Sequence, residues 1–318
     1  MYKKFVKTIL AFCLTILAIL ALFITFFFHT VTPQYTMIYT AAMIDKAARL
    51  NSVEGPRIVL IGNSNLAFGI DSSLIEEAYG MPVVNMGMHG GFGNPFDEQV
   101  CRLNVHEGDI YVIAHHTYAD DDTIQNPELV WMTIEDHKEL YPLIRPQDYS
   151  NMARAFPRYA FKATVRWLRQ TITGREVPVD GAEGFFARSA FNEYGDDAYP
   201  RDEVLYTFDE TSIQMPEVND TCTERLNALN AWLEERGARM VVAGYPIGDG
   251  EYTPEREAYD AFEAELREAL DCPVISRFTD YMYPYNLFYD SNLHLTTEGA
   301  RLRTEQLIKD LEPVIEQQ

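Results

Sequence analysis

The stretch RIVLIGNSN at residues 57–65 gives the clearest indication of the fold class. Four consecutive apolar residues follow Arg57, and Gly62 and Asn63 then end the run with residues that favour turns. This pattern predicts a short buried strand that enters a turn at Ser64. Similar apolar runs recur along the chain, at residues 82–87, 109–114, 239–244 and 273–275.

Helical segments are expected between these strands, at about residues 72–79, 95–103, 254–270 and 297–311. Short apolar strands that alternate with helices indicate an α/β fold in which helices cover both faces of a parallel sheet. The alternation stops between Thr117 and about Asp220. A segment of that length is too long for a bare loop in a compact domain, so we expect an inserted cap with helices of its own at residues 117–220.

The N-terminal residues have the composition of a membrane anchor. Lys3, Lys4 and Lys7 precede residues 9–28, which carry no charge and match the length of a helix that crosses the hydrocarbon core. No small-residue cleavage site follows, so we predict an uncleaved single-pass signal anchor with its N-terminus in the cytoplasm and the rest of the chain outside. The predicted order is a cytoplasmic head with the anchor, a juxtamembrane connecting helix and the α/β domain, at residues 1–30, 31–56 and 57–316.

The formal net charge is −22, from 48 acidic and 26 basic side chains. Nucleic acid is therefore not an expected partner, because a phosphate backbone needs a cationic surface. The four cysteines contain no Cys-x-x-Cys pair, which argues against a structural zinc site. Cys101, Cys222 and Cys272 would lie outside the membrane, so at most one disulfide can form, and the sequence leaves the pair open.

Three residues lie where reactive groups gather in an open parallel sheet, beyond the carboxyl ends of the strands. Ser64, Gly87 and His294 would supply a nucleophile, a backbone donor and a base for acyl transfer. Each also has a purely structural interpretation. Ser64 or Asn65 can cap a helix, Gly87 can serve an ordinary turn, and His294 can pack at the start of the last helix.

The order of three motifs resembles that of the SGNH/GDSL hydrolase superfamily. The motifs are Gly62-Asn63-Ser64, Asn85-Met86-Gly87 and the segment from Asp290 to His294. Outside the insertion, the resemblance extends from Arg57 to the closing helix, and it implies a three-layer α/β/α, flavodoxin-like sheet. It also implies that Ser64 is the nucleophile, that His294 is the base, and that the backbone of Ser64 and Gly87 forms the oxyanion hole.

Some residues depart from the pattern of this family. Gly-Asp-Ser is Gly-Asn-Ser here, and the Gly-x-Asn-Asp block that usually completes the oxyanion hole has no counterpart. The family's acid stands three residues before the histidine, where this chain has Ser291, whereas Asp290 stands four before it. Either the loop bulges so that Asp290 reaches the His294 ring, or Ser64 and His294 work with a weaker orienting group. We expect Asp290 to reach the ring.

The third strand run ends in His115-His116, and we expect these histidines and Asn65 to be candidates for substrate contact. Together with His89 and the acids at residues 120–122, they also suggest a metal site. Adjacent side chains on a strand point to opposite faces, however, so the two histidines cannot easily share one ion. No metal and no cofactor are therefore predicted.

Residues 145–175 contain seven basic residues and one acid, Asp148. Helical spacing predicts a basic stripe beside an apolar stripe, formed by Arg158, Lys162, Arg166 and Arg169 and by Phe161, Val165, Leu168 and Ile172. Such a helix can dock onto anionic lipid headgroups, an anionic acceptor polymer or a membrane partner. Alternatively, it packs on the core and its basic face pairs with the acidic residues between 176 and 220.

These observations lead to two hypotheses about function. The first is a membrane-anchored extracytoplasmic serine esterase or O-acyltransferase that acts on acyl esters, of cell-surface glycans or of small molecules. Its architecture is similar to that of proteins that work beside membrane-bound O-acyltransferases, such as the D-alanyl-transfer protein of teichoic acid modification. The second is an SGNH-like binding or assembly subunit of a cell-envelope acylation system that has lost efficient chemistry.

Overall fold

The computed structural model describes residues 2–119 and 122–317. Its central sheet has four parallel strands in the order β2-β1-β3-β4. These strands are β1 (Ile58–Ile61), β2 (Val83–Asn85), β3 (Ile110–Ile113) and β4 (Arg239–Val242). Val274 forms one parallel bridge with Val242, so the fifth apolar run extends the sheet by a single bridge. The prediction of an α/β fold with a parallel sheet is confirmed.

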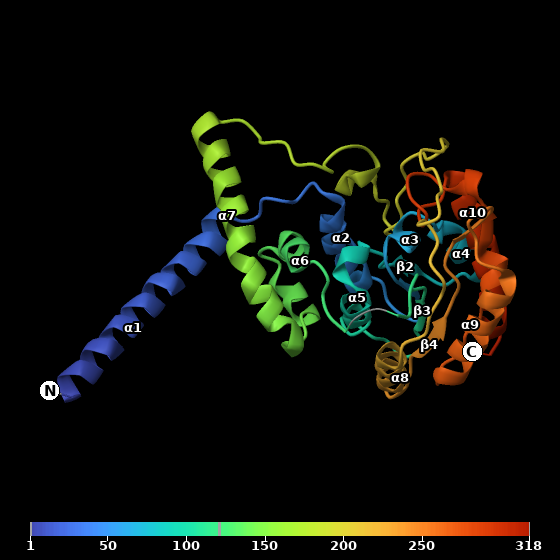
Figure 1. Ribbon diagram of the computed structural model, residues 1–318, viewed down its shortest axis with the longest axis horizontal. Coiled ribbons are helices and arrows are strands. Elements are labelled where there is room, and N and C mark those ends of the chain that lie inside the picture. The colour runs from blue at the N-terminus through green and yellow to red at the C-terminus, as the bar shows by residue number, and fades with distance from the viewer. Residues whose placement is uncertain (1, 120–121, 318) are drawn as a thin grey trace.

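Helices cover both faces of this sheet (Figure 1). One face buries Ile58 and Leu60 of β1 against α4 (Ser72–Tyr79) and α10 (Thr297–Ile315). The other face buries Val59 and Ile61 in a cluster that includes residues of α2 (Ala42–Ser52), α5 (Asn94–Val100), α8 (Asp220–Glu234) and α9 (Arg256–Ala269). Because the strands are buried on both faces, they read as continuous apolar runs rather than as alternating ones.

The N-terminal helix α1 (Tyr2–Phe26) projects from the body of the protein, and none of its residues is buried (Figure 1). It continues into a π-helical turn at Phe27–Val31. Among the residues that the structure describes, this is the one helix that is long and apolar enough to cross a membrane.

The sequence led us to expect a single connecting helix after α1, but this segment does not form one. Its helix, α2, is confined to Ala42–Ser52, and Met43 and Leu50 belong to the core of the α/β body. Nearer to α1, the backbone amides of Gln34 and Tyr35 donate hydrogen bonds to the carboxylate of Glu135, at 2.8 and 2.9 Å. The segment that was expected to be a juxtamembrane linker is therefore packed into the protein.

The insertion has two parts. Helices α6 (Pro127–Ile134) and α7 (Tyr149–Thr173) pack against each other and against the end of α1, and α6 also contributes Val130 and Ile134 to the core of the α/β body. The second part, residues 174–219, returns to the body, where the carbonyl of Tyr194 accepts a hydrogen bond of 2.9 Å from the amide of Asn85. The insertion therefore has helices of its own, but both of its parts pack against the α/β body.

Short elements complete the described chain. The helix α3 (Ser64–Ala67) follows β1, and β5 (Ile247–Asp249) pairs with β6 (Met282–Pro284) in a small second sheet. The 3₁₀ turns are Tyr39–Ala41, Gly90–Phe92, Lys138–Leu143, Pro146–Asp148, Gly184–Phe186, Arg188–Ala190, Phe278–Tyr281 and Tyr285–Leu287.

Candidate active site at the carboxyl edge of the sheet

Ser64 lies on the first residue of α3, directly beyond the carboxyl end of β1. Asn63 caps this helix, because its side-chain oxygen accepts the Asn65 amide at 3.0 Å. The Ser64 hydroxyl is thus not needed as a cap, and it makes no hydrogen bond to any residue within 2–119 or 122–317. Its own amide lies in the first turn, where a helix offers no acceptor. A half-buried hydroxyl and a free amide at one residue suit a nucleophile better than a capping role.

His294 is held by the acid that stands four residues before it. Its Nδ1 lies 2.8 Å from Asp290 Oδ1. Ser291, three residues before His294, instead accepts the His294 backbone amide at its Oγ, at 3.1 Å. The loop therefore bulges as expected for Asp290. A carboxylate acceptor favours the tautomer with the proton on Nδ1, which leaves the lone pair of Nε2 available to take a proton.

Ser64 and His294 lie on neighbouring elements. The His294 ring packs on Phe68, with ring centroids 4.5 Å apart, and the Phe68 amide donates to the Ser64 carbonyl at 2.9 Å. No hydrogen bond between the Ser64 hydroxyl and the His294 ring is present in the described chain. Catalytic hydrogen bonds are often long without substrate and tighten only in the complex.

Gly87 does not offer the free amide that the sequence analysis assigned to it. Its N–H donates to Asn85 Oδ1 at 2.9 Å, and its carbonyl accepts from the buried Lys46 ammonium. A Cβ at this position would lie 2.7 Å from the Ala67 amide nitrogen. Glycine is therefore required because α3 packs directly on this loop, and the oxyanion role expected for the Gly87 amide is wrong for this arrangement.

Asn65 is part of the core and not a substrate contact. It is fully buried, and its Nδ2 donates to Asn63 Oδ1 at 2.7 Å and to the Ala114 carbonyl at 2.9 Å. Its Oδ1 accepts from the guanidinium of Arg303, a buried residue of α10, at 2.8 Å. This network fixes the loop that carries Ser64. Sequence reasoning missed Arg303 because its helical position gave no signal that set it apart from exposed arginines.

The two adjacent histidines lie in different environments, as strand geometry requires. His115 is fully buried, with Nε2 3.4 Å from Glu98, so the expected substrate contact is wrong for this residue. His116 is half-buried, contacts the Asn63 amide and lines a polar cavity of about 600 Å³. Burial and the neighbouring His115 lower the pKa of His116 to about 4, so its ring is neutral at pH 7.

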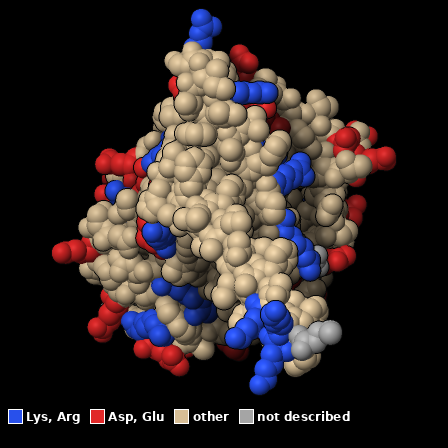
Figure 2. Space-filling model, turned by 90° about the vertical axis from the view of Figure 1, so that its left-hand side faces the viewer, with Lys and Arg blue, Asp and Glu red and all other residues tan. Residues whose placement is uncertain are grey.

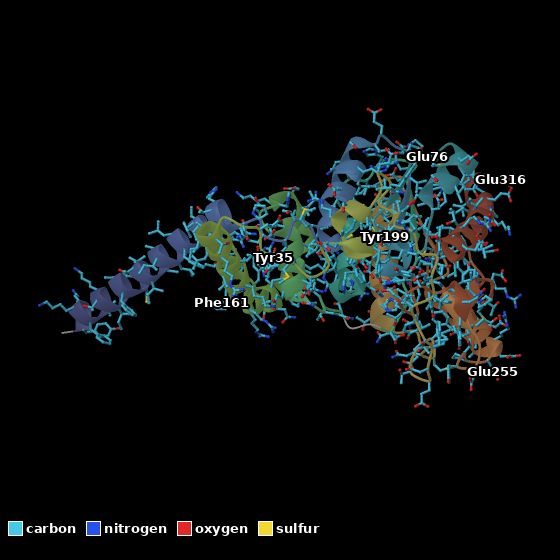
Figure 3. All side chains as sticks on the ribbon, turned by 90° about the horizontal axis from the view of Figure 1, so that it is seen from above. Tyr35, Glu76, Phe161, Tyr199, Glu255 and Glu316 are labelled. Carbon is cyan, nitrogen blue, oxygen red and sulfur yellow. The ribbon has the colours of Figure 1, made fainter. Side chains whose placement is uncertain are left out.

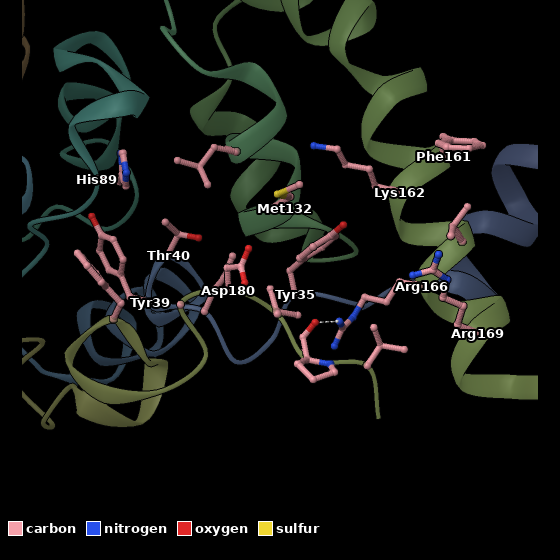
Figure 4. Close-up of a pocket in the computed structure, with 18 residues that line it drawn as sticks. Tyr35, Tyr39, Thr40, His89, Met132, Phe161, Lys162, Arg166, Arg169 and Asp180 are labelled. Carbon is pink, nitrogen blue, oxygen red and sulfur yellow. Dashed lines mark hydrogen bonds between the residues drawn. The ribbon is translucent and has the colours of Figure 1, made fainter. Parts of the chain in front are cut away.

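A second cavity of about 600 Å³ extends from Tyr39 and His89 to α7 (Figure 4). One end is formed by Tyr39, His89 and Phe186, and the Phe186 ring lies 6.5 Å from the His294 ring. Burial, with a smaller contribution from the neighbouring His294, lowers the pKa of His89. The other end is formed by Lys162, Arg166 and Arg169 of α7. Phe186 lies in the insertion, where no periodic pattern pointed to the site.

The basic residues of α7 do not pair with the acidic segment that follows. Arg158 and Lys162 both contact the carboxylate of Glu128 on α6. Arg166 donates to the carbonyls of Gln34 and Pro178, each at 3.0 Å. No ion pair in the described chain joins α7 to an acid between 176 and 220. Arg166 thus contacts this segment through the Pro178 carbonyl, but the expected pairing of the basic face with its acids is not present among the described residues.

Groups that bind metal ions are not assembled in the described chain, where no three His, Cys, Asp or Glu side chains lie close enough to hold an ion. Asp120 and Asp121, considered as ligands above, lie outside the described residues. No disulfide links the four cysteines. Comparison with protein families, with curated proteins and with solved structures found no match to this chain, so its function is argued from the site itself.

Proposed function

We propose that the protein is a membrane-anchored extracytoplasmic serine esterase or O-acyltransferase. The observation that carries this proposal is the pair formed by Asp290 and His294, at 2.8 Å, on the loop beside the helix that begins at Ser64. A carboxylate on Nδ1 of a histidine, and a serine whose hydroxyl makes no hydrogen bond to the described residues, are groups that nucleophilic acyl transfer needs.

In this mechanism, Ser64 Oγ attacks the carbonyl carbon of an acyl ester while His294 Nε2 takes the hydroxyl proton. Asp290 keeps the ring oriented and stabilises the imidazolium that forms. His294 then gives the proton to the leaving alkoxide, and a water or an acceptor hydroxyl attacks the acyl-serine in the second half. The Ser64 amide, in the first turn of α3, supports the oxyanion. Because Gly87 is already bonded to Asn85, a second donor would have to come from elsewhere or from a shift of this loop.

The strand order supports membership of the SGNH superfamily as part of the proposal. The order β2-β1-β3-β4, continued by the Val274 bridge, agrees with the flavodoxin-like order of strands. In such sheets, ligands bind beyond the carboxyl ends of the strands, where Ser64 lies. An anchor with a cytoplasmic N-terminus would place the site outside the cell membrane. The substrates would then be acyl esters of cell-surface glycans or small acyl esters, and a membrane-bound O-acyltransferase would be the natural partner.

The test is labelling of the full-length protein in detergent with a fluorophosphonate probe, which forms a covalent bond with activated serines. We expect labelling of the wild type, its loss in Ser64→Ala, and a large reduction in His294→Ala. Ser73→Ala is a matched control, because Ser73 is an exposed serine near the start of α4, bonded to Asp71. An unlabelled wild type that unfolds cooperatively would contradict an activated Ser64.

The second candidate function is a binding or assembly subunit that keeps the fold without efficient chemistry. Two observations favour it: the Gly87 amide is occupied, and no hydrogen bond joins Ser64 to His294. The same labelling experiment separates the two functions, because a subunit of this kind would not react with the probe but would keep its affinity for its acylation partner.

A further inference from the structure

Helix α7 carries a row of apolar side chains that the protein does not cover. Phe161, Leu168 and Ile172 are 70, 47 and 74% exposed. On the opposite side of the same helix, Tyr159 and Ala163 are fully buried against α6 and the end of α1. Single exposed apolar residues are ordinary on protein surfaces, but a row of large ones along successive turns of one helix marks a contact surface.

This row lies where α1 leaves the body. Phe26 packs on Trp167 of α7 with ring centroids 5.8 Å apart, and Phe27 packs on Phe156 and Tyr159 at 5.6 Å each. In Figure 1, α7 crosses the end of α1 and stands between it and the α/β body. Figure 3 places Phe161 at the α1 end of the molecule, with Tyr35 further toward the body. A helix that crosses the end of a membrane span lies along the membrane surface.

The charges beside the row have the sign that anionic headgroups attract. Arg158 and Lys162 share the single carboxylate of Glu128, which leaves a positive charge in excess, and Arg169 is exposed. Figure 2 faces the end from which α1 projects, and in this view, which also includes the lysines at the start of α1, Lys and Arg lie nearer the centre and Asp and Glu mostly toward the outline. The protein as a whole is acidic, but physiological salt screens charges that are more than about 8–10 Å away. The attraction of this face to anionic headgroups therefore depends mainly on the basic side chains beside the row.

We propose that α7 lies in the outer surface of the membrane, with Phe161, Leu168 and Ile172 among the lipid chains and its basic side chains among anionic headgroups. The occupant of this face is the lipid of the same membrane that holds α1, because the two helices are in direct contact. The inference rests on the proposed anchoring by α1. It also places the basic end of the cavity beside α7 at the level of the headgroups.

The experiment measures how deeply single side chains of the full-length protein lie in lipid. Cys13 is replaced by serine, because it is exposed on α1, whereas the other three cysteines are buried and do not react in the folded protein. Cysteine is then introduced at Phe161, Leu168 or Ile172 and carries a nitroxide spin label. Leu14→Cys, on α1, reports on the anchor itself. Tyr252→Cys is the control for an exposed apolar side chain: it is 38% exposed and precedes Glu255, which Figure 3 labels at the end away from α1, by three residues.

The protein is reconstituted into nanodiscs of phosphatidylcholine with phosphatidylglycerol, and the labels are tested against oxygen, which concentrates in lipid, and a nickel chelate, which stays in water. We expect the oxygen-to-nickel accessibility ratio at the three α7 sites to exceed that at 252 by on the order of threefold or more, as for a helix buried about 5–10 Å into the interface. The ratio should fall in discs of phosphatidylcholine alone.

Two outcomes would overturn the inference. If the α7 sites are as accessible to nickel as position 252 while position 14 is lipid-exposed, α1 anchors the protein but α7 does not touch lipid. A protein partner would then be the occupant of this face. If position 14 is itself accessible to nickel, the proposed anchoring fails as well.

Discussion

The packing of α3 on the loop after β2 leads to a quantitative prediction for Gly87→Ala. The new Cβ would lie 2.7 Å from the Ala67 amide nitrogen, 2.7 Å from Leu66 Cβ and 2.9 Å from Asn85 Oδ1. Carbon atoms in good contact are about 3.5–4.0 Å apart, so α3 must move by on the order of 0.7 Å. Backbone atoms and a Cβ cannot turn aside as the tip of a flexible side chain can. We therefore expect overpacking to cost about 2 kcal/mol.

The matched control is Gly90→Ala, since the nearest atoms to a Cβ there are those of the Asn63 side chain at 3.9 Å. Both substitutions reduce the conformational freedom of the unfolded chain by the same amount. The difference in stability between the two variants therefore reports the steric clash at position 87 alone. We expect thermal unfolding, followed by circular dichroism in detergent, to occur about 4 °C lower for Gly87→Ala than for Gly90→Ala. Because α3 begins at Ser64, fluorophosphonate labelling should also slow by about tenfold. Equal transition temperatures for the two variants would refute the packing account.

Three further predictions concern the site and its supports. Asp290→Asn should slow fluorophosphonate labelling by about 10²–10⁴-fold, whereas Ser291→Ala should change the rate little, and equal effects would contradict the role given to Asp290. Asn65→Ala should lower the free energy of unfolding by about 2–4 kcal/mol in urea titrations, because Ala114, Asn63 and Arg303 each lose a hydrogen-bond partner. Asn286 is an exposed asparagine, so the control Asn286→Ala should lower the free energy of unfolding by less than about 0.5 kcal/mol. Burial raises the pKa of the Glu135 carboxyl from its ordinary 4.5 to about 7, so between those values the native state holds a proton that the unfolded chain has released. Stability should therefore fall by up to about 3 kcal/mol as pH rises through that range, and a pH series of thermal unfolding should show that Glu135→Gln removes this part of the slope.

Features that depend on local sequence pattern were predictable here. The four buried strands follow from apolar runs bounded by turn residues, and α1 and α7 follow from their length and helical spacing. Features that depend on tertiary contacts were not. Strand geometry implies that His115 and His116 face opposite sides, but only the fold determines which of them faces the core. The Gly87 amide could be expected near the site, but the side chain of Asn85, two residues earlier, determines whether that amide is free.

Buried charged groups were the least predictable feature, because charged side chains are mostly exposed and no spacing sets the exceptions apart. Glu135 is 2% exposed and Arg303 is 1% exposed. Glu135 ties the segment after α1 to α6 and, through the hydroxyl of Tyr159, to α7. Arg303 ties α10 to the loop that carries Ser64. Both join segments that are distant in sequence, so their roles appear only when the chain is folded.

The packed segment between α1 and α2 determines what the protein can reach. A flexible tether would let a reaction centre sweep a volume that grows with its length, so it could meet acceptors at many heights above a bilayer. Here Tyr35 and Tyr39 are buried, and Glu135 holds the backbone at Gln34 and Tyr35. In the proposed function, the membrane span and the active site would therefore move as one piece. Acceptors would have to come to a fixed height above the bilayer. A flexible insert in this segment would widen the range of heights at which the site meets acceptors, but the site would no longer be held at one height.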